Sequence, residues 1–366
     1  MQSLLRGAQI VFKHKIRDAR FIYTRTLYTR DELGVVHFEK LRADAFKQFK
    51  NLESAIEYKE GIISNFDNYQ LDQQRDNLKH YILLIDGKKD ELNTLKRFLI
   101  KYTDNFNNNT HRVKPFVFGT QIMRLFYFLN LPDEAVTLFR DPDVKECFHQ
   151  METYKVLLSL LYENKRYEEV IDLYKQIKLR LDAFELKPSQ TVDCLLFASC
   201  YLQNTPEHYE YTRKVWQSIK DLKPLRRTQF LLAGLAIKQD DPNFALSLNV
   251  FSFYVTSRFI RFIAFTKLGQ FEKAFNILNQ SIVSCSRGTD TQKPCIGKEM
   301  VEDLRRSIEK SGTEEQLNKF NRIYDDLKSF DLLSDETLDE HLCASFPPML
   351  PKNQFKKMQR NIIKDN

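Results

Sequence analysis

The fold of this chain is decided by residues 153–174, which read TYKVLLSLLYENKRYEEVIDLY. The first half carries apolar residues three and four positions apart, which is the spacing of one helix face: Tyr154, Leu157, Leu158 and Leu161. A polar break at 163–166 follows, and a second apolar series then runs from Tyr167 to Ile177. This pattern predicts two helices joined by a short turn.

The helix pair is one copy of a repeat with a period of 35 residues. Four pairs of neighbouring residues match across that offset: Ile122-Met123 with Leu157-Leu158, Phe126-Tyr127 with Leu161-Tyr162, Glu134-Ala135 with Glu169-Val170, and Leu138-Phe139 with Leu173-Tyr174. Fainter copies cover 191–220, 227–251 and 259–278, and a further pair precedes them at 68–102. Each pair has more apolar surface than it can cover alone, so we expect neighbouring pairs to stack into an α-solenoid.

The amino-acid composition favours the same fold class. Only 10 of the 366 residues are glycine, well below the usual ~7%. Glycine supplies the turns of β-barrels and sandwiches and the phosphate loops of nucleotide-binding folds, so its scarcity argues against these classes. The sequence therefore predicts an all-α protein.

The repeat resembles that of the pentatricopeptide repeat family. Thr153-Tyr154 stands where that family opens its repeat, and Leu186-Lys187-Pro188-Ser189 is similar to its Ile-Lys-Pro-Asp close. Two departures are visible: Lys165 replaces the usual glycine between the helices, and extra residues separate Ile177 from Lys187. The resemblance implies an α-solenoid that binds single-stranded RNA at one base per repeat.

In this family, each repeat faces one base with the residue after its Thr-Tyr opening and with its last residue. The resemblance implies Lys155 and Ser189 for these positions in the clearest repeat, and Thr120 in the repeat before it. In the next repeat the position falls on Asp193, or on Cys194 if the register shifts by one. Because Lys155 suits a phosphate better than a base edge, the base-reading pattern is damaged at this repeat.

Other candidate RNA-binding residues are cations on or just before the predicted first helices, which line the concave side of the array in this family. They are Arg124, Arg226, Arg227, Arg258 and Arg261. If they converge, together with Lys155, they would attract a phosphate backbone. The alternative is that they are solvated positions on amphipathic helices.

The positive charge of the chain is concentrated at its N-terminus. Residues 1–30 hold seven arginines and lysines and one acid, Asp18, so they carry +6 of the net +7. These cations alternate with apolar residues, which is typical of a mitochondrial transit peptide and predicts a location in the mitochondrial matrix. Removal between Arg20 and Asp31 would leave a nearly neutral protein. The alternative is an ordinary basic N-terminal helix.

These patterns divide the chain into five segments. We predict a transit peptide at 1–28, an N-terminal helical region at 31–66, the helical-repeat solenoid at 67–290, C-terminal capping helices at 291–345, and a basic, disordered tail at 346–366. Thr313 and Gln316 fit a capping box at the start of the last long helix. No apolar stretch is long enough to span a membrane, so we expect no membrane insertion.

The sequence contains no motif for catalysis, nucleotide binding or metal binding. Its six cysteines are scattered, which predicts reduced thiols rather than a disulfide framework. Cys147 with His149 and His341 with Cys343 lie two residues apart, but neither pair has a second pair nearby. We therefore predict no enzyme, no metal and no other cofactor.

The resemblance and the N-terminal charge together imply a mitochondrial RNA-binding protein that acts in the maturation or stability of mitochondrial transcripts and supports respiratory-chain function. It would act by occupying single-stranded RNA, and RNA-processing enzymes or the mitochondrial ribosome would be further partners. Two alternatives stay open: a ribosome-associated structural protein of the mitochondrial small subunit, and a helical-repeat scaffold that binds a peptide.

Overall fold

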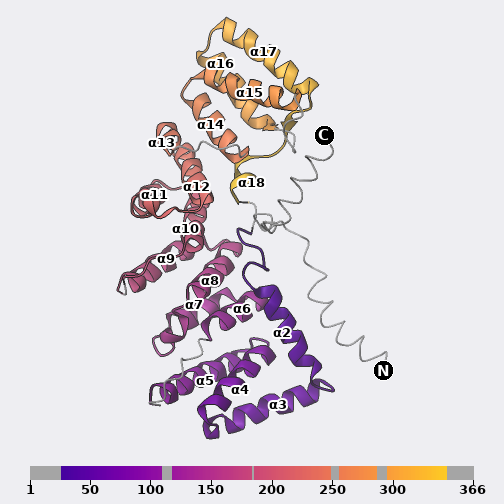
Figure 1. The fold of residues 1–366 in the computed structure, drawn as a ribbon, viewed down its shortest axis with the longest axis vertical. Helices are drawn as coiled ribbons and strands as arrows, with labels where there is room; N and C mark the ends of the chain where they lie inside the picture. Colours follow the sequence, from indigo (N-terminus) through magenta and orange to yellow (C-terminus); the bar gives the residue numbers. More distant parts are fainter. Residues whose placement is uncertain (1–25, 109–117, 184, 249–254, 287–294, 344–366) are drawn as a thin grey trace, which may run out of the picture.

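A computed structural model describes residues 26–108, 118–183, 185–248, 255–286 and 295–343. Within these ranges the chain is almost entirely helical, and successive helices stack into one elongated array (Figure 1). The prediction of an all-α solenoid is confirmed. The predicted transit peptide, except for its last three residues, and the predicted basic tail lie outside the described residues.

The described part of the array is built from seven successive helix pairs. The first helices are α4 (Leu71–Leu84), α6 (Gly119–Leu129), α8 (Met151–Glu163), α10 (Gln190–Gln203), α12 (Arg226–Lys238), α14 (Val255–Lys267) and α16 (Lys298–Ser311). The second helices are α5 (Lys89–Asn108), α7 (Pro132–Arg140), α9 (Tyr167–Asp182), α11 (Pro206–Ile219), α13 (Pro242–Ser247), α15 (Phe271–Ser286) and α17 (Glu314–Ser329). We call the side formed by α6, α8, α10 and α12 the inner face (Figure 1).

Helix starts in the array follow ordinary capping chemistry. Three second helices, α7, α11 and α13, begin with a proline, which loses no hydrogen bond at that position. The capping box predicted at Thr313 is confirmed, since its side chain accepts from the Gln316 amide and the Gln316 side chain accepts from the Thr313 amide. These local rules explain why the sequence predicts the helix pairs well.

The turns between first and second helices share one backbone feature. From α6 to α15, each turn holds one residue in the left-handed region: Asn130, Lys165, Asn204, Asp240 and Gly269. The Lys165 amide donates to the Tyr162 carbonyl at 3.0 Å, which closes the last turn of α8. Lys165 therefore adopts the conformation for which the repeat family uses glycine.

Replacing Lys165 with glycine is expected to stabilise the protein by about 0.5–1 kcal/mol, because glycine adopts a positive φ without Cβ strain. Lys165 is exposed at φ 60°, so its side chain adds little packing. Urea unfolding of the two proteins checks this. Asn204→Gly is the matched control and should shift stability less, since asparagine tolerates this region; equal shifts would contradict the explanation.

The array buries two apolar clusters. The larger one runs from Leu27 to Cys343 and joins α4–α13, and the smaller one lies among α14–α17. A short parallel pair of strands, β1 (Ile296–Gly297) and β2 (Leu333–Ser334), lies at the open end of the α16–α17 pair. No helix among the described residues has the length and apolarity needed to cross a bilayer.

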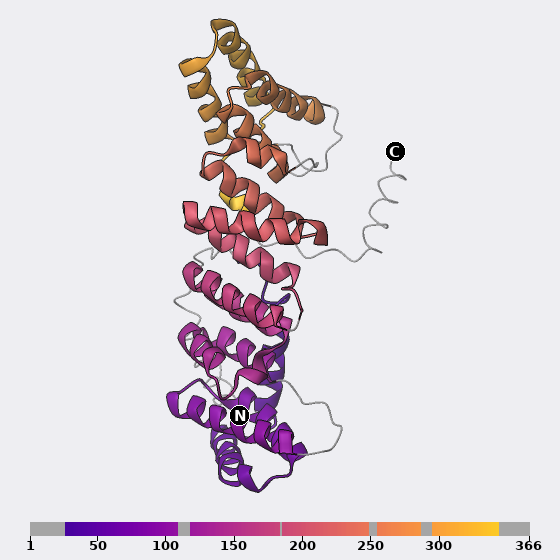
Figure 2. The same ribbon diagram turned by 90° about the vertical axis from the view of Figure 1, so that its left-hand side faces the viewer.

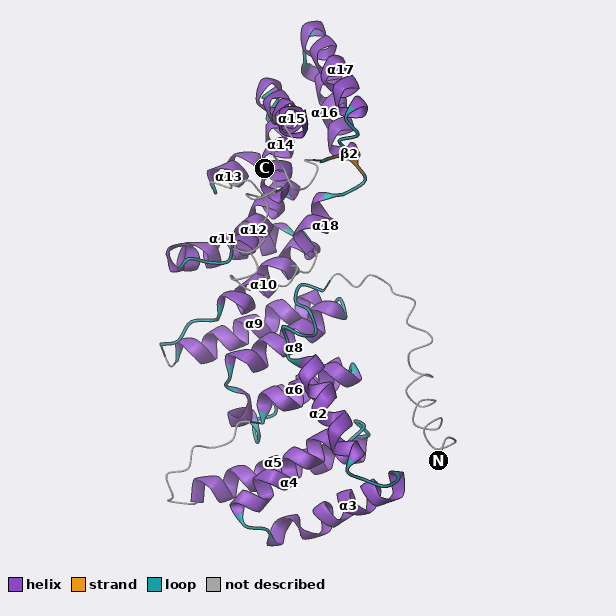
Figure 3. Cartoon of the chain, turned by 45° about the vertical axis from the view of Figure 1, so that its right-hand side comes forward, coloured by secondary structure: helices purple, strands orange, loops and turns teal. Residues whose placement is uncertain are grey.

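Segments outside the helix pairs cover the inner face. The helix α2 (Val35–Lys47) packs across α4 and α6, and α3 (Leu52–Asn65) packs on α4. Residues 26–34, which we call the N-terminal strap, continue from α2 along the inner face (Figure 1). The short helix α18 (Leu338–Cys343) returns from α17 to the middle of the array and packs on α12 and α14 (Figures 2 and 3).

Candidate nucleic-acid interface

Three of the predicted RNA-binding cations lie in a row on the inner face, and all three bind the N-terminal strap. The Arg124 side chain on α6 donates to the Leu33 carbonyl at 2.9 Å, and Lys155 on α8 donates to the Glu32 carbonyl at 2.8 Å. Arg227 on α12 donates to the carbonyl of Leu27, at 3.2 Å. The strap therefore runs along the inner face with its main-chain oxygens on the cations.

Side chains of the strap are anchored as firmly as its carbonyls. Leu27, Tyr28 and Leu33 are all buried, and the Tyr28 hydroxyl donates to the Thr191 carbonyl at 3.1 Å. Burial raises the pKa of Tyr28, and the Lys155 ammonium lies 5.3 Å from its ring centroid. Leu27 and Tyr28 fall inside the range predicted as transit peptide, yet they belong to the core of the array.

The other terminal segment, α18, places a carboxylate on the inner face. Asp339 accepts a hydrogen bond from the Tyr201 hydroxyl and lies 3.2 Å from the Lys238 ammonium. Lys238 also lies 3.9 Å from the Tyr201 ring centroid. A Cβ on Gly234 would lie only 2.6 Å from a methyl of Leu342, so glycine at this position lets α18 approach α12 closely. Sequence patterns did not point to Asp339 or Tyr201.

The predicted base-reading positions are engaged within the protein. Thr120 is buried and hydrogen-bonds to the Gln150 and Thr153 side chains at 2.8 and 2.9 Å. Asp193 is buried and accepts from the Tyr174 hydroxyl at 2.7 Å, and burial raises its pKa to about 6. Ser189 caps α10 through the Val192 amide.

Cys194, the alternative to Asp193 as the base-reading residue, is a fully buried residue of α10. Burial raises the pKa of its thiol to about 11, so it is a neutral apolar residue at physiological pH. An RNA base could reach Thr120, Asp193 or Cys194 only if these internal contacts were exchanged.

The remaining predicted cations lie apart from the strap. Arg226 is exposed at the first residue of α12. Arg258 on α14 is half-buried and donates to the Ser281 hydroxyl of α15 at 3.3 Å, and Arg261 is half-buried on the same helix. The structure therefore brings Arg124, Lys155 and Arg227 together on the strap. The other three predicted cations, Arg226, Arg258 and Arg261, lie elsewhere.

A half-buried carboxylate lies beside the strap, at the end of α8. Glu163 accepts a hydrogen bond from the Tyr127 hydroxyl of α6, and the Arg30 guanidinium of the strap lies 5.9 Å from the Tyr127 ring centroid. Desolvation by burial raises the pKa of Glu163 to about 7, although the Tyr127 hydrogen bond and Arg30 oppose this rise. Glu163 is thus protonated in the folded protein under mildly acidic conditions.

This carboxylate predicts a pH dependence of stability. Between about pH 4.5 and 7, the folded Glu163 keeps a proton that the unfolded chain loses, so its contribution to stability falls as pH rises through this window. Glu163→Gln keeps a neutral acceptor for Tyr127, and its Tm should match wild type at pH 5 and exceed it by a few degrees at pH 8. The exposed Glu210→Gln should show no such divergence; a constant offset between E163Q and wild type would refute the assignment.

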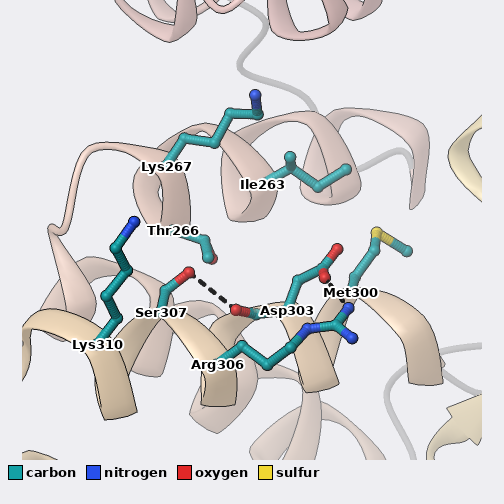
Figure 4. Close-up of a pocket in the computed structure, with 8 residues that line it drawn as sticks. All are labelled: Ile263, Thr266, Lys267, Met300, Asp303, Arg306, Ser307 and Lys310. Atoms are coloured by element: carbon teal, nitrogen blue, oxygen red, sulfur yellow. Dashed lines mark hydrogen bonds and ion pairs between the residues drawn. The ribbon is translucent and has the colours of Figure 1, made fainter.

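An open cleft of about 360 Å³ lies between α14 and α16 (Figure 4). Lys267, Arg306 and Lys310 line it, but Lys267 pairs with Asp240 at 2.9 Å and Arg306 pairs with Asp303. The acids offset two of the three cations in the cleft. On the inner face, Glu152 likewise lies 3.9 Å from Arg124 and 3.5 Å from Lys155.

The histidine and cysteine pairs noted in the sequence make other contacts. His149 pairs with Glu146 at 2.8 Å, and His341 pairs with Glu336 at 3.1 Å. Cys147 and Cys343 are buried thiols. In the part of the chain that the structure describes, no group of three His, Cys, Asp or Glu side chains converges to hold a metal ion.

The fold and this face define a helical-repeat solenoid whose first helices carry a row of cations. No family model matches the chain. It is 27% identical to mitochondrial pentatricopeptide repeat-containing protein 2 of Danio rerio over 261 residues, which cover 69% of this chain but only 64% of that protein. The Xenopus laevis protein of the same name is 24% identical over 92% of this chain and 86% of its own length. The Homo sapiens protein is 20% identical over 72% of this chain and 66% of its own length. The chain is a distant homologue of vertebrate mitochondrial pentatricopeptide repeat-containing protein 2.

Proposed function

We propose that this protein binds single-stranded RNA in mitochondria and assists the maturation or stability of mitochondrial transcripts, and so supports respiratory-chain function. The observation that carries the proposal is the row of Arg124, Lys155 and Arg227 on the inner face, where each cation already holds an oxygen acceptor. The similarity to mitochondrial pentatricopeptide repeat proteins also supports the proposal. Three repeats, those of α6, α8 and α12, present these cations along the strap, and a repeat array follows a nucleic-acid strand in a similar way.

The mode of action that fits this face is occupancy. Cations along a groove bind the phosphate backbone with an affinity that falls as salt rises, because bound counterions are released. Within the described ranges, no group of three His, Cys, Asp or Glu side chains that could hold a metal ion accompanies Arg124, Lys155 and Arg227. The protein would cover a segment of RNA and control the access of processing enzymes, in the mitochondrial matrix.

The strap bears on how the precursor would be processed. Because Leu27 and Tyr28 are buried in the array, a mature protein that lacked them would lose part of its core. We therefore place the end of the proposed transit peptide before Thr26. Mass spectrometry of the N-terminal peptide of the protein from mitochondria tests this, and a terminus beyond Tyr28 would contradict it.

Crosslinking of the protein to RNA in intact mitochondria, followed by sequencing of the protected fragments, tests the proposed function. We expect sharp footprints at one or a few transcript junctions. Fragments spread along the small-subunit ribosomal RNA would favour the ribosome-associated alternative instead. Recovery of no RNA above background would overturn both.

A second candidate function is a scaffold that binds a peptide, and one observation favours it. The inner face holds a polypeptide segment through its main-chain carbonyls and through buried apolar side chains, Leu27 and Leu33. A peptide-binding face would recognise a segment from another protein in the same way. Binding that is insensitive to salt, with no RNA recovered, would support this candidate.

A further inference from the structure

The two helices in the middle of the inner face, α10 and α12, leave few residues exposed to solvent. In α10, ten of 14 residues are buried, and in α12 ten of 13 are buried, so neither helix keeps a broad polar face toward water. An amphipathic surface helix normally exposes one polar side. The neighbouring helices bury much of α10 and α12, and on the inner face the strap and α18 add to this cover.

The strap is held on the inner face through main-chain carbonyl oxygens, and the acceptor oxygens of another ligand could replace them. Three of its contacts are hydrogen bonds from Arg124, Lys155 and Arg227 to neutral carbonyl oxygens. Arginine and lysine form charge-assisted hydrogen bonds with phosphate oxygens, and a guanidinium can donate two parallel bonds to one phosphate. An RNA strand that lay along the same row would therefore offer these cations anionic acceptors in place of neutral ones.

Aromatic side chains lie beneath the same cover. Tyr127, Tyr162 and Tyr201 occupy the same turn of α6, α8 and α10, one in each repeat, and all three are buried. Arg30 of the strap lies over the Tyr127 ring, and Lys238 lies over the Tyr201 ring beside the Asp339 carboxylate of α18. Aromatic rings at repeat spacing beside cations are the usual parts of a single-strand site, where bases stack on the rings.

We propose that the N-terminal strap is a displaceable cover of the RNA site: its carbonyl oxygens and the phosphates of an RNA strand are alternative acceptors for Arg124, Lys155 and Arg227, so that RNA occupies the inner face only when the strap leaves it. This inference rests on the proposed function and adds to it a form of regulation. The fraction of molecules with an open face then scales the apparent affinity for RNA. Any factor that holds the strap away would raise RNA binding without touching the RNA.

Gly34 is the strap residue at which a single substitution can loosen the strap. It lies at φ 69°, and a Cβ there would lie 2.6 Å from the Arg124 guanidinium. Gly34→Ala therefore strains the backbone at this positive φ and forces the strap and the Arg124 guanidinium apart, while it removes no cation from the inner face. A second variant, Tyr28→Ala with Leu33→Ala, removes two buried anchors of the strap.

The test measures binding of a fluorescently labelled, mixed-sequence single-stranded RNA to the full chain. We expect G34A and the Y28A/L33A variant to bind roughly tenfold more tightly than wild type, since opening a largely closed site raises the competent fraction. Tyr58→Ala is the matched control: Tyr58 is exposed on α3, away from the strap, and the variant should bind as wild type does. Adding Lys155→Gln to G34A should remove much of the gain and flatten the salt dependence.

Hydrogen exchange of the strap amides gives an independent readout that needs no variant. Saturating RNA should speed exchange in 26–34 of wild type, because the bound strand displaces the strap. If wild type and both strap variants bind RNA equally and strap exchange does not change, the inference fails while the proposed function stands. If none of the proteins binds RNA at low salt, the proposed function fails, and the inference fails with it.

Discussion

Replacing Phe98 with alanine is expected to destabilise the N-terminal end of the array by about 3–5 kcal/mol, because a fully buried ring leaves a cavity that the surroundings fill only in part. Phe98 on α5 is 0% exposed. Its ring stacks on Phe66 at 3.8 Å between centroids and meets the edge of Tyr81 on α4 at 5.1 Å. Three elements meet at this ring, so its loss removes aromatic pairing as well as apolar burial.

Urea unfolding followed by circular dichroism, with hydrogen exchange of α4 and α5, measures the effect. Each repeat of a solenoid contacts mainly its neighbours, so exchange should rise in α4 and α5 far more than in α16. Phe330→Ala is the matched control, because Phe330 is 40% exposed and its loss should cost within about 0.5 kcal/mol. Similar losses in the two variants would show that the Phe98 ring does not hold α4 and α5 together.

The helix pairs could be predicted because their signals are local. Apolar residues three and four apart, prolines at helix starts and polar breaks all act within a few residues, and each has a direct structural cause. The turn at Lys165 shows the limit of such rules. The sequence departs from the glycine of the family there, and the structure keeps the left-handed turn at a cost in backbone strain.

The strap could not be predicted, because every contact that fixes it is distant in the sequence. Leu27 meets Arg227 across 200 residues, and Glu32 meets Lys155 across 123. A nine-residue segment without helical periodicity carries no local signal for such a position. Its anchors Leu27 and Tyr28 directly follow a basic stretch, and that stretch predicts a transit peptide rather than part of the core.

The candidate site was predicted in part. The sequence placed Arg124, Lys155 and Arg227 on first helices, where the structure also has them, but it did not supply their partner. One signal was available: the stretch from Val192 to Tyr201 is almost continuously apolar, so α10 has no side suited to open solvent. A first helix that is apolar on all sides indicates that another part of the chain, or a ligand, covers the inner face.

Replacing Arg42 with leucine is expected to cost about 3 kcal/mol, because the substitution leaves buried carbonyl groups without their charged donor. Arg42 on α2 donates to the carbonyls of Leu83 and Ile85 at 2.9 and 2.6 Å, and to Asp86 at 2.5 Å. These carbonyls close the C-terminal end of α4, where the helix offers them no amide partner. Thermal unfolding of Arg42→Leu measures the loss, and Arg42→Lys should recover only part of it, since one ammonium cannot span all three acceptors.

The same variant should also release the strap. Because α2 follows Gly34 directly, the Arg42 guanidinium that holds α2 on α4 also fixes the C-terminal end of the strap on the inner face. Hydrogen exchange should therefore rise in both 26–34 and 35–47, and RNA affinity should rise in parallel with G34A. Arg305→Leu is the matched control: its side chain is 43% exposed and pairs within α16 with Glu309, so both readouts should stay at wild-type values. Faster exchange in α2 without faster exchange in the strap would mean that Leu27, Tyr28 and Leu33 hold the cover on their own, and that α2 only stabilises the array.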